Sequence, residues 1–165
     1  MNTPFRVGLG YDVHRMVAGR PCILGGVQIP SEAGPEGHSD ADVLAHALCD
    51  ALLGAAGLGD IGQHFPNTDA RYAGADSMVL LTRVCTMVRE AGYQVVNADC
   101  VVVAEAPRIA PYVAAMRQRL AEVMQVLPER VSIKATTGEG LGFVGKGEGI
   151  VAHAVVLLAA ADAFR

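Results

Sequence analysis

Apolar and polar positions divide the chain into short strand-like segments and longer helical ones. Segments that are rich in β-branched residues or that alternate apolar positions predict strands over residues 6–13, 94–104, 131–135 and 149–158. Longer segments that begin at a capping residue or at proline predict helices over residues 39–53, 76–92 and 107–124. Cys22 to Ile29 predicts a hairpin, because Gly25 and Gly26 separate two short apolar runs.

The helix ends and the connecting segments carry further signals. Ser39 is expected to cap the first helix, with Asp40 and Asp42 in its first turn, where a carboxylate interacts favourably with the helix dipole. Gly92 is expected to end the second helix in a left-handed conformation. Residues 31–37 predict a polar loop, and residues 54–69 predict a long structured loop of the kind that often carries function.

Strands that alternate with three predicted helices indicate an α+β fold, in which the helices pack on one face of a mixed β-sheet. Residues 151–158 are apolar at nearly every position, which is typical of a strand buried on both faces. These helices are too few to cover both faces of the sheet. We therefore expect residues 1–165 to form a single domain whose other sheet face is buried between subunits.

The composition and charge indicate which classes of partner to expect. Apolar residues make up 52% of the 165 residues and Trp is absent, which predicts a large aliphatic core. The net charge is −4 and no basic run occurs, so we expect no nucleic-acid partner. No apolar run reaches the ~18 residues of a membrane span, and no signal peptide is recognisable at the start, so we expect no membrane partner.

The cysteines indicate a compartment rather than a site. They stand among apolar neighbours without the spacing of a metal site, at Cys22, Cys49, Cys85 and Cys100. We expect reduced cysteines in the core of a cytoplasmic protein.

Asp12, His14 and His46 form a candidate metal site. Asp12 and His14 are two residues apart on a predicted strand, so their side chains point to the same side. One carboxylate and two imidazoles can hold zinc and leave an open position, as catalytic zinc sites do. The alternative is a surface carboxylate with histidines satisfied by hydrogen bonds. Asp42 and Asp50 share a helical face with His46, and either could orient its imidazole or touch substrate.

The other histidines carry weaker signals. His38 precedes the first helix in a loop, which suits a group that faces substrate, although a loop residue without a role has the same pattern. His64 lies in the long loop. His153 lies within an apolar strand, which favours a core or interface residue.

A glycine-rich turn follows the predicted strand at 131–135. Residues 140–146 fit the G-x-x-x-x-G-K part of a phosphate-binding loop, but Gly147 replaces the hydroxyl residue and a strand follows in place of a helix. These two departures exclude a P-loop nucleoside triphosphatase. The turn can still hold phosphate through backbone N–H groups, with Thr136, Thr137 and Glu139 beside it for phosphate and metal contacts. The alternative is a hairpin turn with capping side chains.

Taken together and in order, these segments resemble the 2-C-methyl-D-erythritol 2,4-cyclodiphosphate synthase family over nearly the whole chain. The matching motifs are Gly10-Tyr-Asp-Val-His14, Ile23-Leu-Gly-Gly-Val-Gln-Ile-Pro30, His38-Ser-Asp-Ala-Asp-Val43, His46-Ala-Leu48, Asp50-Ala-Leu-Leu-Gly54, Leu58-Gly-Asp-Ile-Gly62, Phe65-Pro66, Gly74-Ala-Asp-Ser77, Ala106-Pro107, Lys134-Ala-Thr-Thr137, Leu141-Gly-Phe143 and Gly147-Glu-Gly149.

The resemblance implies a phosphorus–oxygen lyase of the non-mevalonate isoprenoid route. The 2-phosphate of 4-diphosphocytidyl-2-C-methyl-D-erythritol 2-phosphate attacks the β-phosphorus, CMP leaves, and a cyclic diphosphate forms. The resemblance also implies a homotrimer with active sites at the subunit interfaces.

Residue roles follow from the matching motifs. The resemblance makes Asp12, His14 and His46 ligands of Zn²⁺ or another divalent metal, and Glu139 a ligand of Mg²⁺ or Mn²⁺ on the diphosphate. It makes His38 and Thr137 catalytic through hydrogen bonds to phosphate oxygens. Implied substrate contacts are Ser39, Asp60, Ile61, Gly62, Phe65, Pro66, Asn67, Thr68, Asp69, Thr136, Gly138, Phe143 and Lys146. The implied cytidine pocket comprises Ala104, Glu105, Ala106, Pro107, Arg108, Ile109 and Ala110.

Three positions depart from the family pattern. Asn67 stands where Asp is frequent, Gly138 where a third Thr is common, and Lys146 where Arg is frequent. Two alternatives to the cyclase remain. One is a zinc-dependent hydrolase of nucleotide diphosphates. The other is a non-catalytic trimer that binds an isoprenoid or nucleotide ligand on its axis. The apolar sheet face is the observation that suggests this alternative.

Overall fold

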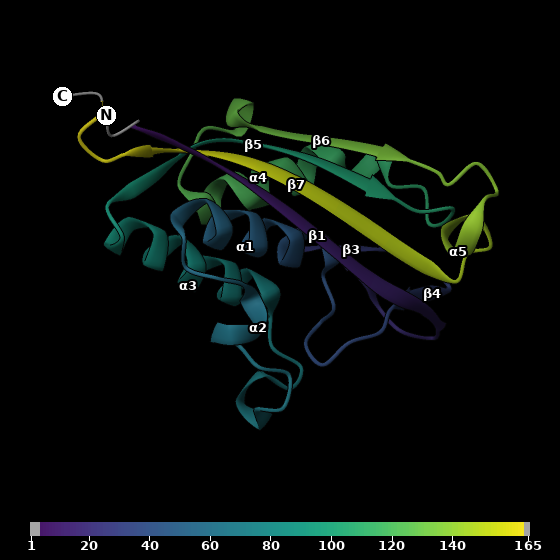
Figure 1. Ribbon diagram of the computed structural model, residues 1–165. Helices are drawn as coiled ribbons and strands as arrows, with labels where there is room; N and C mark the ends of the chain where they lie inside the picture. The colour runs from purple at the N-terminus through teal and green to yellow at the C-terminus, as the bar shows by residue number, and fades with distance from the viewer. Residues whose placement is uncertain (1–3, 164–165) are drawn as a thin grey trace.

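A mixed sheet of five strands forms the frame of the molecule (Figure 1). The structure is a computed structural model and describes residues 4–163. The strand order is β4-β1-β7-β5-β6, with antiparallel neighbours except for the parallel pair β5 and β6. The strands are β1 (Phe5–Ala18), β4 (Ala33–Pro35), β5 (Tyr93–Val103), β6 (Val131–Thr136) and β7 (Gly149–Ala160). The α+β class with a mixed sheet is as predicted.

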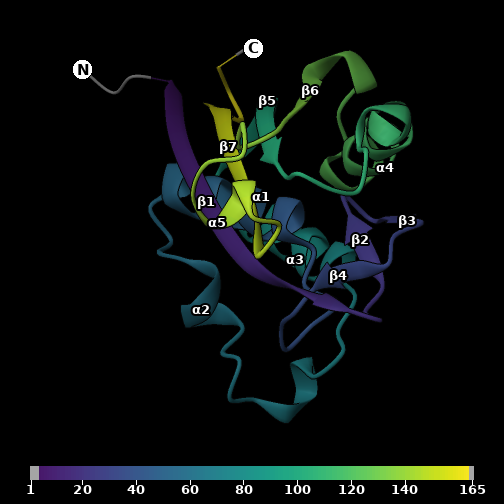
Figure 2. The ribbon, with the colours of Figure 1, turned by 90° about the vertical axis from the view of Figure 1, so that its right-hand side faces the viewer.

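The longer helices lie on one side of this sheet (Figures 1 and 2). They are α1 (Val43–Ala56), α3 (Ser77–Glu90) and α4 (Val113–Met124). α1 packs against β1 and β7, while α4 packs against β6. The short elements are β2 (Cys22–Leu24), β3 (Val27–Ile29), α2 (Ile61–His64), α5 (Gly142–Gly145) and the 3₁₀ turns η1 (Ala70–Tyr72), η2 (Ala110–Tyr112) and η3 (Pro128–Arg130).

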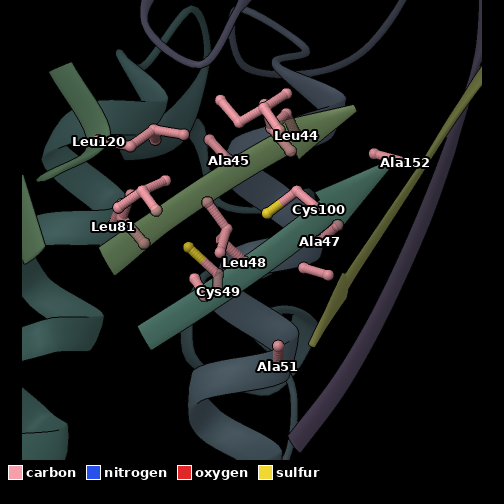
Figure 3. Close-up of a cluster of buried hydrophobic side chains, with 14 of the residues drawn as sticks. Leu44, Ala45, Ala47, Leu48, Cys49, Ala51, Leu81, Cys100, Leu120 and Ala152 are labelled. Atoms are coloured by element: carbon pink, nitrogen blue, oxygen red, sulfur yellow. The ribbon is translucent and has the colours of Figure 1, made fainter. Parts of the chain in front are cut away.

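The core fills the space between the sheet and the helices. Leu44 and Leu48 of α1 lie among Leu81 of α3, Leu120 of α4 and Cys100 of β5, all of them buried (Figure 3). The four cysteines are free and buried, which confirms their predicted place in the core. α1 is therefore surrounded by the sheet and the other helices, and its position is fixed on several sides.

Two glycines let α1 approach β1 closely. A Cβ atom added at Gly10 would lie 1.7 Å from the Ala47 carbonyl oxygen, and one at Gly8 would lie 1.9 Å from the Ala51 carbonyl oxygen. Real Cβ atoms never come so near, so only glycine fits at these two positions. The backbones of strand and helix are consequently in direct contact beside the segment that carries Asp12 and His14.

The opposite face of the sheet exposes a group of apolar side chains in the single chain. Val7, Leu9, Tyr11 and Val13 of β1 are 69%, 70%, 50% and 41% exposed, and Val155 on β7 is 44% exposed. Leu9 pairs with Val155 in the register, so these side chains lie side by side. We call the exposed apolar side chains of Val7, Leu9, Tyr11, Val13 and Val155 the outer face. Its burial between subunits stays a prediction.

Several local predictions need correction. Asp42, not Ser39, caps α1: its side chain accepts from the Ala45 N–H, and the helix begins at Val43. The predicted loop at 31–37 contains β4, because residues 33–35 pair with the end of β1, which runs on to Ala18. Helical turns begin only at Ala110 instead of Pro107, after a cis peptide bond between Ala106 and Pro107.

The remaining connections gain short helices. The loop at 54–69 includes α2, and the glycine-rich turn contains α5. Gly92 has a positive φ of 86°, as expected for a residue that follows a helix. Among the described residues, no helix is both long and apolar enough to span a membrane.

Candidate metal centre

Asp12, His14 and His46 converge although they come from a strand and a helix. Asp12 Oδ2 lies 2.9 Å from His14 Nε2 and 3.2 Å from His46 Nδ1. The two ring nitrogens are 3.2 Å apart. One oxygen and two nitrogens thus lie together, a donor set that suits Zn²⁺ and related divalent ions.

The fold dictates this convergence. Asp12 and His14 alternate with Tyr11 and Val13 along β1, so their side chains project toward α1 while the other two project to the outer face. The close approach at Gly10 brings His46, one residue before Ala47, within reach of the strand. A metal centre here depends on the strand and helix being in backbone contact.

The Glu36 carbonyl orients the His14 ring. His14 Nδ1 lies 2.7 Å from this oxygen, and a carbonyl can only accept, so Nδ1 donates. The neutral ring then has its lone pair on Nε2, the nitrogen that faces Asp12 and His46. A carbonyl that fixes the tautomer in this way is common behind a metal-binding histidine.

The three groups also shift each other's pKa. Burial raises the pKa of the Asp12 carboxyl, but hydrogen bonds from His14 and His46 and their charge outweigh it and lower the pKa from 3.8 to about 2. Burial lowers the pKa of His14, but the hydrogen bond and charge of Asp12 outweigh it and raise the pKa. Asp12 is therefore a carboxylate at neutral pH, the form that binds cations.

A cavity of about 480 Å³ opens in front of the cluster. Its walls bring together many residues that the sequence predicts for the site: Asp12, His14, His38, Ser39, His46, Ile61, Gly62, Phe65, Pro66, Asn67 and Thr68. Tyr72 and Leu80 also line it and were not predicted. Tyr72 stacks edge to face on Phe65 at 5.3 Å between ring centroids, which explains how the loop at 61–72 holds its shape.

Two predicted carboxylates of this loop have other partners. Asp60 caps α2 by accepting from the Gln63 backbone N–H at 3.0 Å and from the Gln63 side chain at 2.6 Å. Asp69 forms an ion pair with Arg71, while its carbonyl oxygen lies 3.1 Å from His38 Nε2, which donates to it. Neither carboxylate lines the cavity, whereas the His38 ring does.

A second group of predicted residues lies around another cavity. Ala104, Glu105, Pro107, Arg108, Ile109, Ala110, Thr136 and Thr137 line it, and Ala106 lines an adjoining one. Glu105 Oε1 accepts from the Gly138 N–H at 2.7 Å and so ties this segment to the glycine-rich turn. This cavity shares no residue with the cavity at Asp12.

The glycine-rich turn holds the remaining predicted residues. Glu139 has a positive φ of 54°, and its N–H donates to Thr137 Oγ1 at 3.2 Å. Phe143 lies in α5 and lines a shallow cavity that also touches His14. Lys146 follows α5 and is exposed.

The expected orientation of His46 by Asp42 or Asp50 is wrong. Asp42 is buried and accepts from the backbone N–H groups of Gly25, Gly26 and Ala45, and Asp50 accepts from the Ile61 N–H. The residues near His46 Nε2 are Ser77 and Ser39, with their hydroxyls at 2.9 Å and 3.2 Å. The sequence marks Ser77 as a helix start and as part of the family motif at 74–77, and its spacing from His46 gives no signal of this contact.

These features define an α+β protein with a carboxylate–imidazole cluster at the base of a cavity that could hold a metal ion. A sequence model of the YgbB family matches residues 5–159, so the chain belongs to this family. A relative from Symbiobacterium thermophilum, named 2-C-methyl-D-erythritol 2,4-cyclodiphosphate synthase, is 65% identical over 153 residues, covering 93% of this chain and 98% of the relative. The predicted family resemblance is confirmed.

Solved structures share the fold. A 2C-methyl-D-erythritol-2,4-cyclodiphosphate synthase described as its CDP-bound form superposes with a TM-score of 0.86 at 40% identity, over 93% of this chain and 99% of that one. The bifunctional IspDF from Campylobacter jejuni gives 0.91 at 44% identity, over 94% of this chain. This chain spans 42% of that bifunctional protein's length.

Proposed function

We propose that this protein converts 4-diphosphocytidyl-2-C-methyl-D-erythritol 2-phosphate into 2-C-methyl-D-erythritol 2,4-cyclodiphosphate and releases CMP. The observation that carries the proposal is the convergence of Asp12, His14 and His46 at an open cavity in a YgbB-family chain. The synthase from Symbiobacterium thermophilum, 65% identical to this chain, and the CDP-bound synthase structure support the substrate class.

Asp12, His14 and His46 would hold Zn²⁺ or a similar ion. Such an ion supplies positive charge and Lewis acidity to phosphate oxygens. Glu139 would hold Mg²⁺ or Mn²⁺ near the diphosphate, since its carboxylate is exposed at the turn. The protein carries a net charge of −4, so cations are the natural means to bind a substrate with several phosphate charges.

The reaction needs positioning more than a nucleophile from the protein. An oxygen of the 2-phosphate forms a bond to the β-phosphorus, the bond from this phosphorus to the bridging oxygen breaks, and CMP departs with that oxygen. His38 and Thr137 would donate hydrogen bonds to phosphate oxygens as charge shifts between them. Ser39 lies on the same cavity wall as His38 and would contact the phosphates.

The sugar and the base would bind to different walls. We assign the erythritol to the segment from Ile61 to Thr68, which lines the cavity in front of the cluster. We assign the cytidine to residues 104–110, which line their own cavity beside Thr136 and Thr137. Asn67, Gly138 and Lys146 would tune affinity only, because none of them touches the metal cluster.

A homotrimer would join these two cavities. In one chain they share no residue, while the outer face exposes apolar side chains such as Leu9 and Tyr11. If a second copy covers this face, residues 104–110 and Thr137 of one subunit can meet the Asp12 cluster of another. An isoprenoid ligand on the trimer axis is a further proposal, supported by the same apolar side chains.

The test is ³¹P NMR of the purified protein with the diphosphocytidyl substrate, Zn²⁺ and Mg²⁺. We expect coupled resonances of a cyclic diphosphate together with CMP. Chelator-treated protein should give none, and added Zn²⁺ should restore them. CMP with a linear diphosphate would instead identify a hydrolase. An unchanged spectrum from zinc-loaded protein would favour a binding module.

A further inference from the structure

The nitrogen of His46 that faces away from the cluster has a defined environment. Ser77 Oγ lies 2.9 Å from His46 Nε2, and Ser77 is fully buried at the start of α3. Behind it, Asp40 Oδ1 accepts from the Ser77 hydroxyl and Asp40 Oδ2 accepts from the Ser77 backbone N–H at 3.0 Å. Asp40, Ser77 and His46 thus form one connected line of hydrogen bonds.

The direction of these hydrogen bonds follows from the donors available. A carboxylate accepts and cannot donate, so the single proton of the Ser77 hydroxyl points to Asp40. Ser77 Oγ then presents only lone pairs to His46, and the contact at 2.9 Å requires a proton on Nε2. Nδ1 lies 3.2 Å from Asp12 Oδ2, so without a cation a proton on Nδ1 makes that hydrogen bond. When a cation takes the place of this proton, the neutral imidazole has one N–H group, at Nε2, and Nδ1 has a lone pair for the cation.

We propose that Asp40 and Ser77 are positioning residues that hold His46 in the Nε2–H tautomer, with Nδ1 free to bind a divalent cation. The inference rests on the proposed metal-dependent function. The carboxylate on this path is Asp40, in the loop that also carries His38 and Ser39. Metal binding at His46 is therefore tied to the conformation of the segment that faces the substrate.

Ser39 does not replace this pair. Its Oγ lies 3.2 Å from His46 Nε2 and accepts the Ala41 N–H at 3.1 Å, so its own proton is free to point elsewhere. Ser39 lines the cavity, whereas Ser77 is fully buried. Without Ser77 the part-buried Nε2–H would keep only the longer contact, to Ser39, and an imidazole that loses its closer hydrogen-bond partner is less well oriented.

The decisive measurement is Zn²⁺ affinity of the metal-free protein, by competition with a chromogenic chelator. We expect Ser77→Ala to weaken binding about 10- to 100-fold, the range for a residue that orients a metal ligand. Asp40→Asn should weaken it similarly, because its amide NH₂ can donate to Ser77 Oγ, which then donates to His46 Nε2 and reverses the tautomer. The shape of the side chain is unchanged, so a steric role would leave Asp40→Asn at wild-type affinity.

A matched control separates positioning from helix stability. Asp76 caps the same helix by accepting from the Met78 N–H and is not part of the line of hydrogen bonds to His46. Asp76→Ala should lower the unfolding temperature and leave Zn²⁺ affinity within about twofold of the wild type, since only the cap is lost. If Asp76→Ala weakens zinc as much as Ser77→Ala does, the positioning role is overturned.

The wild-type protein provides an independent readout. In zinc-loaded protein with ¹⁵N-labelled histidine, we expect His46 Nε2 to be protonated and Nδ1 to be metal-bound; the reverse assignment would overturn the proposal even if Ser77→Ala fails to fold. If the wild-type protein and Ser77→Ala bind zinc equally well, the positioning role is refuted and the proposed function is not affected. If the wild-type protein binds none of Zn²⁺, Mn²⁺ and Co²⁺, the proposed metal-dependent function is refuted together with the positioning role.

Discussion

The two faces of strand β1 differ in whether their residues have partners within the chain. Toward the helices the strand presents Gly8, Gly10, Asp12 and His14, and each has a partner within the chain. Toward the other side it presents Val7, Leu9, Tyr11 and Val13, which are 41–70% exposed. The inner residues are explained by contacts that one chain contains. The outer residues predict a second surface that packs against them.

The largest effect is expected from a substitution on the inner face of β1, the side toward the helices. Gly10→Ala places a Cβ atom 1.7 Å from the Ala47 carbonyl oxygen, so strand and helix must separate. We expect a loss of about 4–5 kcal/mol in the free energy of unfolding, measured by urea denaturation. Gly54→Ala is the control, because nothing lies within 4 Å of its added Cβ, and it should stabilise α1 by about 0.5–1 kcal/mol. Equal stability of the two variants would refute the close contact.

The outer face is tested by Leu9→Lys. If a second copy covers Leu9, the variant buries an unpaired charge, and association should weaken by about 3–4 kcal/mol. Light scattering should then show a monomer for the variant and the expected trimer for the wild-type protein. Leu127→Lys changes a residue of similar exposure, 67% against 70%, away from this face and should leave the mass unchanged. A trimeric Leu9→Lys would mean that this face is not the interface.

His14→Ala removes one donor from the inner face. We expect zinc affinity to fall by more than the ~100-fold typical for an outer partner of a ligand, so that protein purified in zinc buffer retains no stoichiometric metal. Elemental analysis measures the retained zinc. His153→Ala is the control. His153 lies on the neighbouring strand β7, beside Tyr11, and the variant should retain zinc. Full occupancy in His14→Ala would rule it out as a ligand.

The smallest expected effect is a pH dependence of the free energy of unfolding of the metal-free protein. Asp12 has a pKa of about 2 in the folded state against 3.8 as its ordinary value, so the unfolded state binds the proton more readily. Its contribution, about 2 kcal/mol, is present above pH ~4 and is lost as the pH falls toward ~2. Unfolding of wild-type protein and Asp12→Asn at pH 6 and pH 2.5 measures it. A stability gap that is the same at both pH values would contradict the shift.

Much of the inner face could be predicted from sequence because it depends on spacing. The two-residue interval between Asp12 and His14 and the helix that carries His46 are local patterns. The role of Ser77 could not be predicted, since it depends on α3 lying beside α1 and on Asp40 lying behind it. Asp42 caps α1 in place of Ser39 for a similar reason. Its carboxylate also receives the N–H groups of Gly25 and Gly26 from a distant hairpin.

The contact of Gly8 and Gly10 with α1 has a consequence for how the protein tolerates change. Side-chain cores adjust to substitution by letting elements drift apart or together. Here two main chains touch, so the strand-to-helix spacing does not depend on the size of any neighbouring side chain. Substitutions elsewhere in the aliphatic core should therefore leave the distance between β1 and α1 unchanged, and with it the approach of His46 to Asp12 and His14.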